Sequence, residues 1–134
     1  MKASKSIYYL DDDQDDLYIF QEVAESLGHK VNTFINGHEL LSALSNPLKK
    51  PDVIFLDIHM PILKGEEILI ILKNAEDWKD IPVVMISGAY PKKLIRYFAE
   101  VGANYLMKRP VVTDFKKALE EVMKIDLTRL PVAP

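Results

Sequence analysis

The sequence contains no cysteine, which removes several classes of site at once. Disulfides, thiol nucleophiles and zinc–thiolate centres are excluded, and nothing indicates an oxidising compartment. No apolar run approaches the roughly 20 residues that cross a bilayer, and the apolar stretch near the N-terminus is too short for a signal peptide. The net charge of -3 is too small to indicate a nucleic-acid partner. We therefore expect a soluble cytoplasmic protein that binds neither membrane nor nucleic acid directly.

The 134 residues, of which 49% are hydrophobic, suffice for one compact domain with a sizeable core. Five short apolar runs are predicted to be strands, the second of them weaker than the rest. They lack the alternation of a half-exposed strand, which favours strands buried on both faces of a parallel sheet. The runs are Ile7–Leu10, Lys30–Ile35, Val53–Leu56, Val83–Ile86 and Tyr105–Met107.

Each predicted strand is followed by apolar residues at helical spacing. Two of these segments are followed by a glycine that suits a helix end, Gly28 and Gly102. Strand and helix alternate five times, which predicts an α/β fold with a doubly wound parallel sheet.

Reactive side chains follow four of the five predicted strands: Asp11 and Asp12, Asp57, Ser87, and Lys108. In an open parallel sheet, ligands bind beyond the carboxyl ends of the strands, so these groups should converge. Three carboxylates in one cleft repel one another unless a cation joins them, and oxygen ligands favour Mg²⁺. A metal beside a carboxylate, an ammonium and a hydroxyl suits phosphoryl transfer, with Asp57 as nucleophile.

Four stretches in the expected order resemble the signature motifs of bacterial response-regulator receiver domains, in particular those like the chemotaxis regulators of two-component signalling. The resemblance covers roughly residues 5–126. It implies a flavodoxin-like strand order 2-1-3-4-5 with helices on both faces, a receiver over residues 1–128, a flexible tail over 129–134 and no output domain. The stretches are YYLDDD (8–13), DIHMP (57–61), ISG (86–88) and YLMK (105–108).

The resemblance also implies a role for each acid. Asp57 would accept a phosphoryl group from the phosphohistidine of a sensor histidine kinase or histidine phosphotransfer protein. Asp12 would bind Mg²⁺ directly and Asp11 would support it through water. Asp57 and the backbone carbonyl of His59 would complete the protein ligands. Beyond self-catalysed phosphoryl transfer and slow autodephosphorylation, no enzymatic activity is expected.

Signalling residues follow from the same resemblance. Lys108 would contact the phosphoryl group, and Ser87 and Tyr105 would form a switch pair. The signal would reach a separate downstream protein through helix 91–101, strand 103–107 and the last helix. A basic cluster on that surface favours an acidic partner: Lys92, Lys93 and Arg96.

The chain departs from the family pattern at three positions: Lys64 replaces an acid, Ser87 replaces the commoner threonine, and Arg109 replaces the proline that normally follows the lysine. A cis peptide bond is cheap only before proline, so we predict a trans Lys108–Arg109 bond, with any cis bond moved to Arg109–Pro110. We also predict that Lys108 points into the acidic site while Arg109 points to solvent or a partner.

Two other interpretations remain open. A haloacid-dehalogenase-like phosphatase would use Asp11 and Asp13 as its Asp-x-Asp pair, although its nucleophile would then follow the first strand rather than the third. Asp13 and Asp16 otherwise suit the start of a helix, with Asp13 as N-cap. A phosphate-independent interaction module on a receiver fold is the second alternative.

Overall fold

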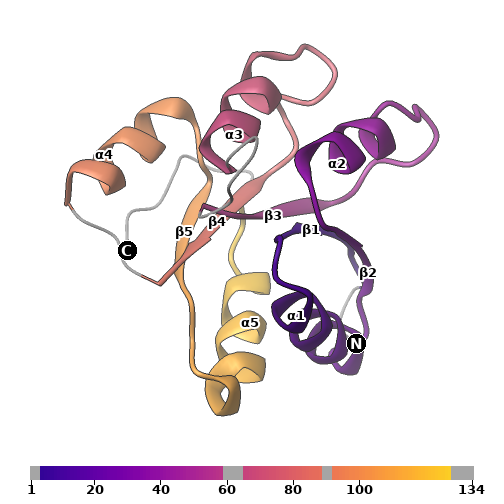
Figure 1. Ribbon diagram of the computed structural model, residues 1–134, viewed down its shortest axis with the longest axis vertical. Helices are drawn as coiled ribbons and strands as arrows, with labels where there is room; N and C mark the ends of the chain where they lie inside the picture. The colour runs from indigo at the N-terminus through magenta and orange to yellow at the C-terminus, as the bar shows by residue number, and fades with distance from the viewer. Residues whose placement is uncertain (1–3, 59–64, 89–91, 128–134) are drawn as a thin grey trace.

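The computed structural model describes residues 4–58, 65–88 and 92–127. Within them, five parallel strands form one sheet in the order β2-β1-β3-β4-β5 (Figure 1). The predicted doubly wound α/β fold and its strand order are therefore confirmed. The strands are β1 (Ser6–Leu10), β2 (Lys30–Phe34), β3 (Val53–Asp57), β4 (Val83–Ser87) and β5 (Tyr105–Lys108).

Helices cover both faces of the sheet, as expected. α1 and α5 pack against one face, whereas α2, α3 and α4 pack against the other (Figure 1). A short 3-10 turn, Val112–Asp114, leads into α5. The helices are α1 (Gln14–Ser26), α2 (Gly37–Leu44), α3 (Gly65–Asn74), α4 (Lys92–Val101) and α5 (Phe115–Met123).

The sheet separates two hydrophobic cores, and β1 contributes to both. Tyr8 and Leu10 point into the core beneath α2, α3 and α4, whereas Ile7 and Tyr9 point into the core beneath α1 and α5. Successive side chains of a strand point to opposite faces, so a strand buried on both faces needs apolar residues throughout. This explains why the runs of β1, β3 and β4 show no alternation in the sequence. The expectation of burial on both faces is wrong for β2, which lies at the edge of the sheet and has no fully buried residue.

Helix boundaries follow local chemistry. The Asp13 carboxylate caps α1 by accepting hydrogen bonds from the backbone N–H groups of Asp15 and Asp16 at 2.9 and 3.1 Å, which confirms its predicted role. Gly28 and Gly102 follow α1 and α4 with φ values of 93° and 118°, a left-handed conformation that glycine adopts without strain.

Several predicted boundaries move by one or two residues. β5 begins at Tyr105, as the apolar run predicted, rather than at the position 103 given for the signalling surface, and the described part of α4 begins at Lys92. Asp57, Ser87 and Lys108 are each the last residue of a strand rather than the residue after it. The predicted tail, 129–134, and the domain limit at 128 lie outside the described residues. None of the described helices is long and apolar enough to cross a membrane.

Phe20 is the centre of the core beneath α1 and α5. Its side chain is fully buried, and its ring lies 4.2, 5.1 and 6.0 Å from the ring centroids of Tyr9, Phe55 and Phe115. We expect Phe20→Ala to lower the free energy of unfolding by about 3–5 kcal/mol, because the lost contacts leave a cavity. Urea denaturation measures this change.

Tyr18 provides the matched control, since it lies on the same helix but is 66% exposed. Tyr18→Ala should change the free energy of unfolding by no more than about 0.5 kcal/mol. Equal losses of unfolding free energy in the two variants would show that the buried Phe20 ring contributes no more to stability than the exposed Tyr18 ring.

Candidate functional site

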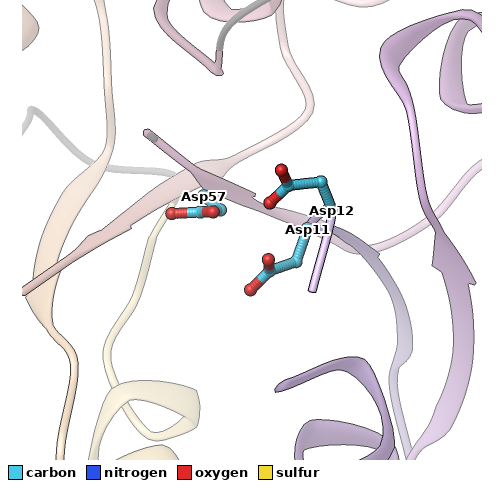
Figure 2. Close-up of side chains that lie close together, drawn as sticks. All are labelled: Asp11, Asp12 and Asp57. Atoms are coloured by element: carbon cyan, nitrogen blue, oxygen red, sulfur yellow. The ribbon is translucent and has the colours of Figure 1, made fainter. Parts of the chain in front are cut away.

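Three carboxylates meet at the carboxyl edge of the sheet. Asp11 and Asp12 directly follow β1, and Asp57 ends β3. Because β1 and β3 are neighbouring parallel strands, with Leu10 opposite Leu56, these positions lie side by side. One oxygen of each carboxylate lies within 4.8 Å of the others, and Figure 2 shows the three side chains around a common space. The predicted convergence of these acids is therefore observed.

The cluster has the chemistry of a site for a hard cation. Asp11 is fully buried and Asp57 is 8% exposed, whereas Asp12 is exposed. Carboxylates this close repel one another, and burial makes the repulsion stronger. A divalent cation with oxygen ligands, such as Mg²⁺ or Mn²⁺, would relieve that repulsion, and the three side chains fit such an ion.

Asp11 is held in place through both of its oxygens. Its Oδ1 accepts a hydrogen bond from the backbone N–H of Asp13 at 3.0 Å, and its Oδ2 accepts one from the Tyr9 hydroxyl at 2.5 Å. Burial, followed by the charge of Asp11, keeps the pKa of Tyr9 above its usual range, with Arg109 opposing the shift. The hydroxyl therefore stays protonated and remains a donor to Asp11.

Ser87 and Lys108 stand at the same edge of the sheet. They are opposite each other at the ends of β4 and β5, and β4 is the neighbour of β3. Ser87 is buried, and Lys108 is exposed. Tyr105 is partly buried and packs against the core beneath α1 and α5. The structure thus places Ser87 and Lys108 at the edge of the sheet where the acids lie, and Tyr105 at the opposite end of β5. The roles of all three stay predictions.

The prediction for Arg109 was wrong. Its Nη2 donates hydrogen bonds to the Tyr9 hydroxyl at 3.0 Å and to Asp11 Oδ2 at 3.1 Å, and its Nη1 lies 3.8 Å from Asp16 Oδ2. The side chain is only 23% exposed, so it points neither to solvent nor to a free partner surface. A buried carboxylate requires a counter-charge, and this guanidinium supplies one to Asp11.

The sequence contained a partial signal for this contact. Five of the six residues from 11 to 16 are acidic, and consecutive side chains at the end of β5 point in opposite directions. A second cation directly after Lys108 should therefore face α1 rather than share the direction of Lys108. Tyr9, which shares a strand face with Asp11, was not assigned a role from the sequence.

The backbone around Arg109 confirms the predicted trans Lys108–Arg109 bond. No peptide bond in the described residues is cis, so no cis bond has moved to Arg109–Pro110, which is also trans. The Arg109 N–H donates to the Ser87 carbonyl at 2.8 Å, which extends the pairing of β4 and β5 beyond Lys108. His59, whose backbone carbonyl was assigned to the metal, lies outside the described residues.

Comparison with known proteins agrees with this geometry. A family model described as the response regulator receiver domain matches residues 7–120. The response regulator SaeR of Staphylococcus aureus is 34% identical over 101 residues, which are 75% of this chain and 42% of SaeR. This chain therefore matches less than half the length of that relative.

Two solved structures share the fold. The phosphorylated cyanobacterial phytochrome response regulator RcpA has a TM-score of 0.81 at 24% identity, covering 91% of this chain and 93% of its own. The Mn²⁺-bound response regulator Rcp1 has a TM-score of 0.78 at 24% identity, covering 96% and 99%. With the family match over most of the sequence, the chain belongs to the response-regulator receiver domains of two-component systems.

Proposed function

We propose that Asp57 accepts a phosphoryl group in a Mg²⁺-dependent reaction and that this modification switches a signalling surface. The observation that carries the proposal is the cluster of Asp57, Asp11 and Asp12 at the carboxyl edge of the sheet. As a receiver domain the chain is a signalling protein rather than a classical enzyme, and its family implies a histidine kinase or phosphotransfer partner.

The reaction moves a phosphoryl group from a donor nitrogen to a carboxylate oxygen. An Asp57 oxygen forms the new bond to phosphorus while the bond from phosphorus to the donor histidine breaks. The other ring nitrogen of the phosphohistidine carries a proton, so the departing histidine keeps the electron pair and ends as neutral imidazole. Asp57 must be ionised to act, and it ends β3 at the carboxyl edge of the sheet with 8% of its surface exposed.

Asp12, Asp57 and, through water, Asp11 would hold Mg²⁺, together with the backbone carbonyl of His59. When bound, the ion would supply charge neutralisation for the phosphoryl oxygens. The oxygen-only donor set supports this assignment, as does the Mn²⁺ reported for Rcp1. Asp11 would help to orient the ion, because its carboxylate is fixed by Tyr9 and by the Asp13 N–H.

Ser87 and Lys108 would meet the transferred group from the neighbouring strands. The Ser87 hydroxyl would donate a hydrogen bond to one phosphoryl oxygen, and the Lys108 ammonium would pair with another. Tyr105 would follow Ser87 as it moves. The phosphoryl group adds about -1.5 to -2 charges, which can favour one of two arrangements of α4, β5 and α5. This surface would then bind a separate protein of acidic character.

The phosphatase alternative is disfavoured by the contacts of its two candidate acids. Asp11 is fully buried, and both of its oxygens already accept hydrogen bonds from neighbouring groups. The Asp13 carboxylate caps α1. Neither acid is presented as a nucleophile or a general acid, and Asp57, which ends β3 beside them, is the remaining buried acid of the cluster.

Phosphorylation by acetyl phosphate tests the proposal directly. With Mg²⁺ present, intact mass measurement should show one phosphoryl group on the parent protein and none on Asp57→Asn. Asp11→Asn should still accept the group, more slowly, because its carboxylate only supports the ion. Two outcomes would contradict the assignment of Asp57. One is phosphorylation of Asp57→Asn, and the other is loss of phosphorylation in Asp11→Asn but not in Asp57→Asn.

A further inference from the structure

Arg109 places a permanent positive charge against the acidic cluster. We propose that this guanidinium is a resident counter-cation that weakens Mg²⁺ binding at the cluster and so sets the metal concentration at which the site fills. The inference rests on the proposed Mg²⁺ site at Asp11, Asp12 and Asp57, and it adds a residue that tunes that site.

The guanidinium is fixed by groups from two elements. From β1 and its end, the Tyr9 hydroxyl and Asp11 Oδ2 accept from Nη2 at 3.0 and 3.1 Å. From the first turn of α1, Asp16 Oδ2 lies 3.8 Å from Nη1. A planar guanidinium with several donors suits such a forked arrangement, whereas an ammonium would hold fewer of these partners at once. Arg109 is therefore a positioned charge rather than a mobile surface one.

The nearer of the two carboxylates that face Arg109 belongs to Asp11, an acid of the proposed metal site. The Asp11 side chain is 1% exposed, so water screens the Arg109–Asp11 pair only weakly. A divalent ion that approaches Asp12 and Asp57 meets an Asp11 whose charge is already compensated, and it is also repelled by the guanidinium itself. Both effects lower the affinity for the ion, and both act without any change in the ligand atoms.

The charge effect gives an expected magnitude. A unit charge in a partly hydrated site, acting on a divalent ion a few ångströms away, changes its dissociation constant by roughly three- to tenfold. Arg109→Gln removes the charge and leaves a polar amide. Arg109→Met removes the charge and leaves an unbranched apolar side chain, and Arg109→Lys keeps the charge.

Mg²⁺ titrations followed by the backbone amide NMR signals of Asp12 and Asp57, without a phosphodonor and at constant ionic strength, test the proposal. Arg109→Gln and Arg109→Met should each bind Mg²⁺ roughly three- to tenfold more tightly than the parent. Arg109→Lys should stay within about twofold of it, because the charge remains. Dispersed amide spectra show that each variant is folded, and either neutral variant suffices if the other fails to fold.

Arg96→Gln is the matched control, because it makes the same charge change at an exposed position on α4. An equal gain in Mg²⁺ affinity in Arg96→Gln would overturn the proposal, because the effect would then come from the net charge of the protein rather than from the position of Arg109. Unchanged or weaker binding in the neutral Arg109 variants, with the parent still binding, would overturn it while leaving the proposed metal site intact. No Mg²⁺ response in any of the proteins would refute the metal site and the inference together.

Discussion

Asp12→Asn should remove the Mg²⁺ dependence of phosphorylation and lower the rate with acetyl phosphate on the order of a hundredfold or more. Asp11 cannot take over the direct contact, because its oxygens already accept hydrogen bonds from Tyr9, Arg109 and the Asp13 N–H. Asp12 is the exposed acid of the cluster, so its carboxylate can contact an ion that arrives from solvent. Phosphorylation rates measured by intact mass over a range of Mg²⁺ concentrations give the result.

Asp13→Asn is the control for this experiment. It removes one negative charge from the adjacent residue, and asparagine caps a helix about as well as aspartate. The Asp13 carboxylate accepts hydrogen bonds from backbone N–H groups at the start of α1. Its loss should therefore leave the Mg²⁺ dependence close to that of the parent. An equal loss of rate in Asp13→Asn would attribute the effect to the overall charge of residues 11–16 rather than to ligation by Asp12.

Much of this site could be predicted from the sequence because parallel strands end at one edge. Once Val53–Leu56 is identified as a buried strand next to Ile7–Leu10, the backbone positions of the acids that follow must be close. The observed spacing of at most 4.8 Å between Asp11, Asp12 and Asp57 is a consequence of that register. The capping role of Asp13 was equally accessible, because it depends only on local backbone geometry.

Arg109 could not be placed in the same way. Its direction depends on which side of β5 it occupies and on whether a buried acid lies within reach of a long side chain. The spacing from Tyr105 to Lys108 and on to Phe115 predicted where Lys108 stands in the fold. It gave no information about the direction of the Arg109 guanidinium. The deciding factor is the burial of Asp11 and Tyr9, a property of the packed fold rather than of any short motif.

At Gly65 the helix α3 lies against the backbone at the end of β3. It is the first residue of α3, and a Cβ added there would lie 2.1 Å from the carbonyl oxygen of Asp57 and 2.9 Å from its carbonyl carbon. A third contact, with the Ile58 Cα, would be at 3.2 Å. These are all backbone atoms, so no side-chain rotation can relieve the overlap. Either α3 or the end of β3 must move.

Gly65→Ala should therefore affect both the fold and the site. We expect the free energy of unfolding to fall by about 1–3 kcal/mol, and phosphorylation of Asp57 to slow by about ten- to a hundredfold, because a small displacement of a nucleophile is costly. Gly88→Ala is the matched control: Gly88 directly follows β4 at the same edge, and no described atom lies within 4 Å of its added Cβ. Urea denaturation and acetyl phosphate labelling of both variants give the comparison. A Gly65→Ala protein as stable and as readily phosphorylated as Gly88→Ala would show that the contact between α3 and Asp57 places no constraint on the site.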